Sequence, residues 1–489
     1  MIQKIKTFLT NNCTIKNFLI LFLIVQPIFD LKIFYSSIST LIRVFFAVLF
    51  FLYYFINSKN KKKYFLLIYP LLILIYFIFH HLNALNFTSL VPGNFSYSFF
   101  QEALYFVKML CPYLLIYSLF KANISKKEIY FILKTIVLEI SLIIIISNLF
   151  LFSYGTYSDA RIKASFLEWF NPNSLYTYKD LSSKGLFEAA NQISATLLMF
   201  LPFMILLNLE DKNKLNLFVL FCNVIALLFL GTKVAVFGIL IVFFYTSLGF
   251  IILKKPLKKI YILIPFIFIY ICLLPFNPTF SRISENKAVV EASLEVPAEQ
   301  NTVNTSVSSE NISVQISKEE YILKYYAQNN INENFILNRY PYQYDVDFWY
   351  NILTSDNPSK SDYRFLEEAM VKRVISINNN NFDSLFGITY TRVQNIFNIE
   401  KDFVMQYFSL GIIGLIVVFA PYYVILFFWI FKILYHKLKS LDLYSSVSFV
   451  TICMIFFVAY YSGNLLNSLG FEIYLSLTIY TLILKSKNG

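Results

Sequence analysis

The sequence predicts an all-α, polytopic membrane protein: a bundle of about twelve transmembrane helices with one large extracytoplasmic loop that contains short amphipathic helices. Three observations predict this class. The 489 residues are 57% hydrophobic and only 14% charged, whereas soluble domains carry about 25% charged residues. Apolar runs of helix length recur from end to end, whereas the strands of a membrane barrel would alternate polar and apolar residues. Short basic connections also alternate with longer acidic ones.

Each apolar run is close to the roughly 20 residues that a helix needs to cross the hydrocarbon core. The tenth run is longer, and we expect that helix to be tilted or to extend beyond the core. The predicted spans cover residues 17–37, 38–57, 64–81, 103–120, 128–152, 189–208, 215–231, 234–253, 260–276, 403–431, 444–463 and 467–484.

The distribution of charge predicts the topology. The connections at 57–63, 121–128, 210–214, 253–259 and 432–439 are short and rich in Lys and Arg. By the positive-inside rule these connections and both termini lie in the cytoplasm, as expected for a multi-pass protein of a bacterial plasma membrane. Because the net charge of +12 lies largely in these connections, no basic patch indicates a nucleic-acid partner.

The spans and connections divide the chain into three parts. Residues 1–276 hold the first nine predicted spans, 277–402 form the large extracytoplasmic loop, and 403–489 hold the last three spans. Within the loop, residues 284–317 are rich in Ser, Asn, Val and Glu and predict a disordered insertion. Residues 361–377 carry apolar side chains at helical spacing and predict an amphipathic helix on the outer surface.

One charged residue stands between two apolar runs. Lys233 interrupts the stretch LLFLGTKVAVFGILIVFF (227–244), which is long enough for parts of two spans joined by a tight turn near Gly231 and Thr232. Lys233 then opens the eighth span at its outer boundary. It is either a lysine that extends its ammonium group to the membrane surface or a fixed cation at a helix N-terminus, where anions bind. Asp30 and Arg43 face each other across the first two spans and predict a structural ion pair.

Four pieces of sequence are spread over nearly the whole chain: QPIFD (26–30), GLFEAANQISATLLMFLP (185–202), LGTKVAVFG (230–238) and LFGITYTRVQNIFNIEKDFVMQYFSLGIIG (385–414). Together they resemble the bacterial O-antigen polymerase and ligase family. The closest likeness in style is to the polymerases of teichuronic acid or capsule in Gram-positive bacteria. The resemblance implies a membrane glycosyltransferase whose donor and acceptor are polyprenyl-diphosphate-linked oligosaccharides held in membrane lipid. It also implies a chain-length regulator and a flippase as candidate partners. In this family a small residue followed by Arg or Lys, here Thr232-Lys233, holds the donor diphosphate.

The implied reaction needs cations for a leaving diphosphate and an acceptor for the proton of the attacking hydroxyl. No Asp-x-Asp pair or His cluster lies on the predicted outer face, so we expect neither a metal nor another cofactor. The predicted donor-binding residues are Lys233, Arg161, Arg373 and Arg392, the predicted proton acceptors are Glu188, Glu400 and Asp402, and the predicted sugar ligand is Asn191.

Each of these residues also has a structural interpretation. Arg161 and Arg373 fit solvated loop charges better than ligands, and Glu400 and Asp402 also fit charges that complement the start of a helix. Asn191 is equally expected to bridge helices, as polar residues do in membranes.

Two other functions stay open. Ligases of the family depend on a His in the large outer loop, and residues 277–402 contain none, which favours a polymerase. Gram-negative polymerases carry Arg and Gly at a fixed separation in two outer loops, a pattern that this chain does not reproduce. A flippase or another transporter, the second function, should show two related halves, which are not found. Nothing in the sequence specifically indicates a non-enzymatic assembly partner.

Overall fold

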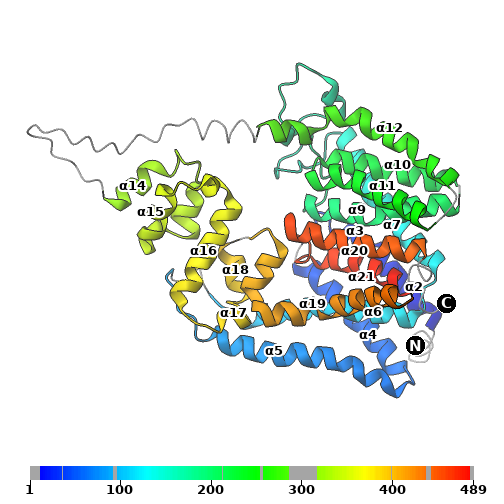
Figure 1. Ribbon diagram of the computed structural model, residues 1–489, viewed down its shortest axis with the longest axis horizontal. Helices are drawn as coiled ribbons and strands as arrows, with labels where there is room; N and C mark the ends of the chain where they lie inside the picture. The colour runs from blue at the N-terminus through cyan, green and yellow to red at the C-terminus, as the bar shows by residue number, and fades with distance from the viewer. Residues whose placement is uncertain are drawn as a thin grey trace, which may run out of the picture. The chain divides into compact units, whose positions relative to one another are not determined.

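The computed structural model describes residues 12–35, 37–91, 96–211, 213–253, 257–285, 317–397, 399–436 and 442–484. The regular secondary structure of these residues is helical. Their β-type backbone pairing is limited to three isolated β-bridges. The contacts divide the chain into two compact units. Unit 1 comprises Met1–Leu72, Phe106–Arg282 and Val418–Gly489, and unit 2 comprises Ile73–Tyr105 and Ile283–Val417. Figure 1 shows the helices of both units along the chain.

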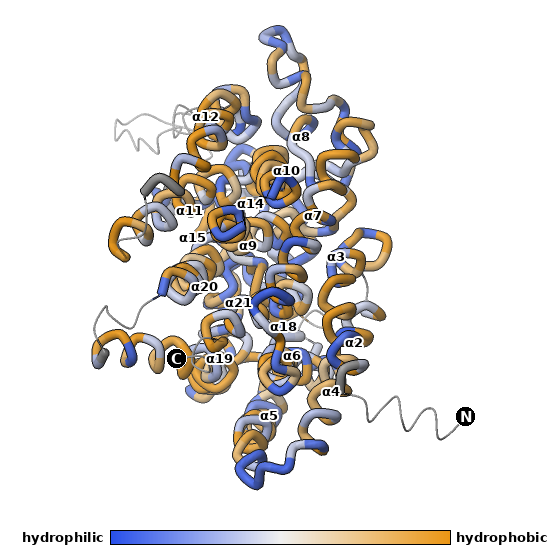
Figure 2. Tube along the Cα trace, turned by 90° about the vertical axis from the view of Figure 1, so that its right-hand side faces the viewer, coloured by the Kyte–Doolittle hydropathy of each residue, from blue (hydrophilic) through white to orange (hydrophobic). Residues whose placement is uncertain are grey.

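Among the described residues, nine helical stretches are long and apolar enough to cross a membrane, and three more apolar helices are shorter. Together they coincide with the twelve predicted spans, so the all-α, multi-pass class is confirmed. Figure 2 shows hydrophobic colouring along most of their turns. The nine are Ser37–Asn57 (α4), Lys61–Ala84 (with α5, Ile68–Ala84), Phe99–Ala122 (α6), Lys126–Leu149 (α7), Ala190–Glu210 (α9), Lys233–Ile252 (α11), Ile260–Glu285 (with α12, Ile264–Leu273), Asp402–Tyr435 (in α19, Asp402–His436) and Leu443–Tyr461 (α20).

The three shorter helices are those of the first, seventh and last predicted spans. They are Thr14–Ile24 (in α2, Asn12–Ile24), Lys214–Leu230 (α10) and Leu469–Leu484 (α21). The first span was predicted to run over 17–37, but α2 ends at Ile24 and the short α3 (Gln26–Phe29) follows. The chain then leaves the helix because the backbone of Leu31 pairs with that of Phe187 in an isolated bridge.

Helix α9 forms the centre of unit 1. Its apolar window is 94% buried, and it packs against α7, α10, α11, α20 and α21. Figure 1 shows α9, α10 and α11 side by side. The predicted pair of Asp30 and Arg43 is confirmed, with Nη2 of Arg43 2.6 Å from Oδ1 of Asp30 and both side chains buried. Gln26 and Tyr474 complete its hydrogen bonds, as a buried ion pair requires.

Unit 2 has a hydrophobic core of its own in the predicted outer loop. The core includes Tyr340, Trp349, Met370 and Val371, all fully buried. Most of its residues come from α14 (Lys318–Tyr325), the π-helical turn Phe335–Arg339, α15 (Val346–Thr354), α16 (Tyr363–Asn378), α18 (Tyr390–Ile396) and the first turns of α19. The short α17 (Asp383–Phe386) lies between α16 and α18 in the chain. Helix α16 lies where the sequence predicts an amphipathic helix. The predicted insertion at 284–317 lies almost entirely outside the described residues.

Helix α19 is interrupted inside unit 2. Gly411 has a φ of +64° and a ψ of −176°, which are not helical angles. A Cβ at Gly411 would lie 2.3 Å from the carbonyl carbon of Leu385, so the close approach of two backbones requires glycine here. The N–H groups of Ile388 and Thr389 donate to the carbonyls of Phe408 and Ser409 at 2.9 and 3.0 Å. These bonds give the carbonyls of Phe408 and Ser409, beside the break, partners outside the helix.

Candidate functional site

The turn between α10 and α11 presents Lys233 at the start of a helix. Helix α10 ends at Leu230, and Gly231 caps it with a φ of +59°, a value that favours glycine. Thr232 caps α11, and its hydroxyl accepts a hydrogen bond from the N–H of Ala235 at 3.0 Å. Lys233 is the first residue of α11 and its side chain is exposed. The predicted break at Gly231 and Thr232 is confirmed.

The loop at 153–188 holds this turn in place. The N–H of Ser183 donates to the carbonyl of Phe229 at 2.9 Å. The hydroxyl of Thr156 donates to the carbonyl of Leu230 at 2.7 Å, and that of Tyr157 donates to the carbonyl of Gly231 at 2.8 Å. The last carbonyls of a helix have no partner within the helix, so these bonds satisfy the end of α10 and fix the position of the turn.

Arg282 places a second cation near the same turn. Its Nη1 donates to the hydroxyl oxygen of Tyr157 at 2.7 Å, and the guanidinium lies 4.1 Å from the centre of the Tyr157 ring. Burial raises the pKa of Tyr157, so its neutral hydroxyl accepts from Arg282 while it donates to Gly231. The sequence analysis did not select Arg282. Its place just after the ninth span, at the predicted outer end, was the available signal.

The N-termini of α9 and α11 lie next to each other. The hydroxyl oxygens of Ser194 and Thr232 are 3.0 Å apart, and α10 reverses the chain between the two helices, so α9 and α11 run in the same direction. Asn191 lies one turn before Ser194 on α9 and therefore on the same side of the helix. Glu188 precedes α9, and its N–H donates to the carbonyl of Asp30 at 3.2 Å. Asn191 and Glu188 are both half-buried.

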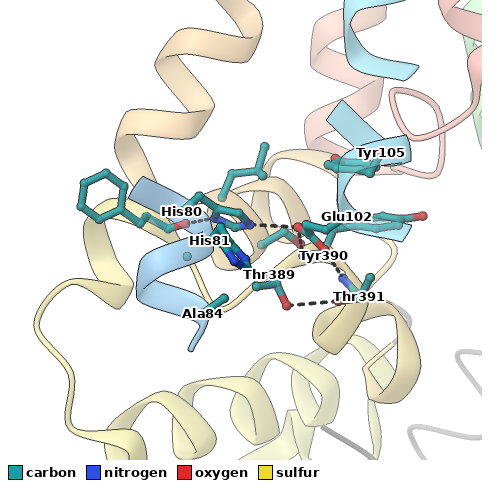
Figure 3. Close-up of polar contacts among 12 residues, drawn as sticks. His80, His81, Ala84, Glu102, Tyr105, Thr389, Tyr390 and Thr391 are labelled. Atoms are coloured by element: carbon teal, nitrogen blue, oxygen red, sulfur yellow. Dashed lines mark hydrogen bonds and ion pairs between the residues drawn. The ribbon is translucent and has the colours of Figure 1, made fainter. Parts of the chain in front are cut away.

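Unit 2 contains a second polar cluster, drawn in Figure 3, around His80 and Glu102. Both side chains are fully buried, and Nε2 of His80 lies 2.9 Å from Oε1 of Glu102. The Nδ1 of His80 lies 2.6 Å from the carbonyl oxygen of Phe386. Both ring nitrogens thus lie within hydrogen-bond distance of an oxygen acceptor. The N–H groups of Tyr390 and Thr391 donate to the carboxylate at 2.9 and 3.0 Å.

Arg392 lies on the helix that Glu102 caps. Its Nη2 donates to the carbonyl of Ala84 at 3.0 Å, and its guanidinium lies 4.2 Å from the Phe87 ring and 5.4 Å from the Tyr97 ring. Burial lowers the pKa of Arg392 to about 10, so it stays a cation at neutral pH. Its side chain is directed at backbone carbonyls and aromatic rings.

The residue before this helix is conformationally strained. Thr389 is fully buried and has a φ of +86°, a value that residues with a Cβ rarely adopt. Its backbone bond to Ser409, the stacking of Tyr105 on Tyr390 at 3.8 Å, and the capping by Glu102 hold it there. Strain of this kind persists only where the surroundings determine the conformation.

Comparison with known proteins identifies the family. The family model described as "O-antigen ligase like membrane protein" matches residues 12–488. The chain belongs to this family. The predicted resemblance is therefore confirmed, and family membership supports a membrane enzyme in the assembly of O-antigen or another surface polysaccharide. No curated protein and no solved structure matches the chain.

In this O-antigen ligase-like protein, four of the predicted site residues lie in unit 1. Lys233, Glu188 and Asn191 gather at the adjoining ends of α9 and α11, and Arg161 lies exposed in the loop that holds the turn, where its backbone pairs with Tyr154. Within the described part of the chain, none of these four side chains makes a hydrogen bond or an ion pair with the protein.

The other four predicted residues lie in unit 2, where three have clear positions in its internal structure. The guanidinium of Arg373 holds Asp345 with two hydrogen bonds, at 2.7 and 3.1 Å. Glu400 accepts from Nε of Arg364 at 2.7 Å. Asp402 is the first residue of α19 and is buried. With Arg392, these residues are set among protein groups, and their proposed roles toward a substrate stay predictions.

Proposed function

We propose that the protein is a polymerase that joins polyprenyl-diphosphate-linked oligosaccharide repeat units into a surface polysaccharide. The reaction takes place at the outer face of the cytoplasmic membrane, with both termini of the chain in the cytoplasm. The observation that carries the proposal is the set of Lys233, Glu188 and Asn191 at the adjoining ends of α9 and α11. A cation, a carboxylate and an amide thus stand at these two helix ends, and within the described residues none of the three side chains makes a hydrogen bond or an ion pair with the protein.

Lys233 suits the donor diphosphate. Two helix N-termini point their N–H groups to the same end of unit 1, and α9 begins after Ala189, which has no side chain to cap it. Such ends attract anions, and Lys233 adds a full charge. Arg282, held over the ring of Tyr157, provides a guanidinium whose geometry matches phosphate oxygens. These positive groups stabilise the charge that develops on the diphosphate as the sugar leaves.

Glu188 is suited to accept the proton of the attacking hydroxyl. The hydroxyl oxygen of the acceptor sugar forms a bond to the anomeric carbon of the donor, and the bond from that carbon to the diphosphate oxygen breaks. The electron pair stays with the diphosphate, and the hydroxyl proton passes to the carboxylate of Glu188. Glu400 is already held by Arg364 and Asp402 is buried, so Glu188 is the carboxylate best placed to receive a proton. Asn191 orients a sugar hydroxyl beside it.

The test substitutes Lys233. Lys233→Met keeps the length and apolar stem of the side chain but removes its charge, so the protein should insert and accumulate normally. We expect polyprenyl-linked single repeat units to accumulate and the rate of polymerisation to fall about 10²–10³-fold, which is typical for loss of one preorganised charge donor. Lys233→Arg should retain partial activity. The control is Lys163→Met, which removes an exposed lysine of the 153–188 loop that pairs with Asp180.

The outcome also separates the polymerase from an O-antigen ligase, the alternative that the description of the family favours. In a ligase the acceptor is a finished membrane lipid rather than another repeat unit. A ligase deficiency would leave long polymer on the polyprenyl carrier, whereas a polymerase deficiency leaves single repeat units. Long polymer at wild-type levels from Lys233→Met would refute the donor site. Long polymer that stays on the polyprenyl carrier would show that the protein is a ligase and not a polymerase.

A further inference from the structure

A small ionic cluster beside Glu188 has no part in the function proposed above. The Oδ1 of Asp159 lies 3.0 Å from Nζ of Lys32 and 3.6 Å from Nζ of Lys184. The three side chains differ in exposure: 79% for Asp159, 30% for Lys32 and 7% for Lys184. One carboxylate on an exposed loop thus serves two ammonium groups, one of which is buried.

The two lysines are anchored more firmly than the aspartate. The N–H of Lys32 donates to the carbonyl of Leu186 at 2.8 Å, and the N–H of Lys184 donates to that of Tyr154 at 3.0 Å. The ammonium group of Lys32 also lies 4.8 Å from the centre of the Tyr154 ring. The backbones of both lysines are therefore held by hydrogen bonds that do not depend on Asp159.

The ion pair of the buried Lys184 with the exposed Asp159 is weaker than a purely structural contact would need. A buried lysine is rare unless it is well paired, yet the only ion-pair partner of Lys184 among the described residues is a carboxylate 3.6 Å away that solvent reaches freely. An ion pair with so exposed a partner adds little to stability. The cluster is thus better suited to exchange one carboxylate for another than to hold the loop.

The cluster adjoins the proposed reaction site. Ser183, the neighbour of Lys184, bonds to the last turn of α10, which leads to Lys233. The N–H of Glu188 donates to the carbonyl of Asp30 at 3.2 Å, two residues before Lys32, and the bridge between Leu31 and Phe187 places the two segments together. A group bound by Lys32 and Lys184 therefore lies next to the proposed proton acceptor.

We infer that Lys32 and Lys184 form an oxyanion subsite for the carboxylate of an acidic sugar in the acceptor repeat unit, and that Asp159 occupies this subsite until the sugar displaces it. The inference rests on the proposed function for the identity of the acceptor. Anchoring at the carboxylate turns a hydroxyl of the same sugar toward Glu188. A neutral repeat unit cannot replace the aspartate, so the subsite also selects the substrate.

Binding to the full-length protein in lipid nanodiscs tests the inference with three probes. Trigalacturonate carries sugar carboxylates, farnesyl diphosphate carries a diphosphate without sugar, and maltotriose is neutral. We expect trigalacturonate to bind more tightly than maltotriose, and more weakly as salt increases. Lys32→Met and Lys184→Met should each raise its Kd about tenfold, since a bound charge pair is lost. Asp159→Asn should lower that Kd severalfold, because the internal competitor is gone.

The control is Lys163→Met, which removes a lysine of the same loop from a different ion pair, and which should leave trigalacturonate binding unchanged. Lys184→Arg keeps the charge and should retain binding, which guards against loss through misfolding. Equal binding of trigalacturonate and maltotriose, or no gain from Asp159→Asn, would overturn the inference. The inference would also be overturned if the Lys32 and Lys184 variants lost binding of farnesyl diphosphate and kept binding of trigalacturonate, because the subsite would then bind phosphate.

The result is separable from the proposed function. If Lys233→Met makes normal polymer while the three binding results hold, the donor site is wrong and the acidic subsite stands. If Lys233→Met abolishes polymer and trigalacturonate shows no preference, the donor site stands and this inference fails.

Discussion

The α10–α11 turn in unit 1 and the His80–Glu102 cluster in unit 2 are built from similar parts and differ in how their charges are used. Each brings a basic side chain and a glutamate to the start of a helix. In the turn, Lys233 and Glu188 make no hydrogen bond or ion pair within the described part of the chain. In the cluster, Glu102 receives three hydrogen bonds and both nitrogens of His80 face acceptors.

The difference indicates which region performs chemistry and which maintains structure. Charged groups cost free energy when they lose water, so a folded protein pairs them unless a ligand is to be their partner. The cluster of unit 2 is paired and holds a strained residue, Thr389, in place. The turn of unit 1 leaves the exposed Lys233 and the half-buried Glu188 without an ion-pair partner among the described residues. Substitutions should therefore reduce activity in unit 1 and stability in unit 2.

The largest effect should come from Glu188. Glu188→Gln preserves the size of the side chain but removes the proton acceptor, and the rate of polymer formation should fall about 10²–10⁴-fold with normal protein abundance. Release of polyprenyl diphosphate from lipid-linked repeat units by the purified protein measures it. Glu400→Gln is the matched variant in unit 2 and should remain close to the wild-type rate. A normal rate for Glu188→Gln and a large loss for Glu400→Gln would indicate that the proton acceptor lies in unit 2.

The next effect concerns the buried pair of unit 2. His80→Phe leaves the carboxylate of Glu102 buried without its imidazole partner, and loss of one member of such a pair costs about 3–5 kcal/mol. Thermal unfolding in detergent should show a markedly lower Tm than for the wild type. Lys233→Met should leave the Tm unchanged or raise it. An unchanged Tm for His80→Phe would mean that the cluster is not a structural clamp.

Arg373 sharpens the comparison, because the sequence predicts it as a donor ligand. Arg373→Met removes two hydrogen bonds from the buried carboxylate of Asp345, and charged hydrogen bonds of this kind contribute about 1.5–3 kcal/mol each. We expect a lower Tm and normal activity per folded molecule. Loss of polymer at an unchanged Tm would instead support the predicted contact with the diphosphate.

The smallest effect should be a pH dependence in unit 2. Burial raises the pKa of Glu367 on α16 to about 8, against the opposing attraction of Arg339. The unfolded chain releases this proton near the ordinary glutamate pKa of about 4.3, so between that pH and about 8 the folded state binds more protons. Stability should therefore fall as pH rises through this range. In Glu367→Gln the decrease of Tm with pH should be shallower, and an identical slope would contradict the assignment.

The sequence by itself determined the features that depend on neighbouring residues. Hydropathy located the described apolar helices, because crossing a membrane requires a continuous apolar helix, but it did not predict that the first would end at Ile24. A glycine followed by Thr and Lys was enough to place the turn at Gly231, and helical spacing was enough to predict α16. The ion pair of Asp30 and Arg43 followed from two charges in adjacent spans, where each needs a partner.

Only the tertiary structure decided which charges are engaged. Arg373 and Asp345 are 28 positions apart, His80 and Glu102 are 22 apart, and Arg282 lies 125 positions from Tyr157. Nothing in the local sequence distinguishes Arg373, which is paired, from Lys233, which is not. Hydrophobic periodicity is a local property of the chain, whereas the partner of a charge depends on which distant segments the packing of the helices brings within about 3 Å.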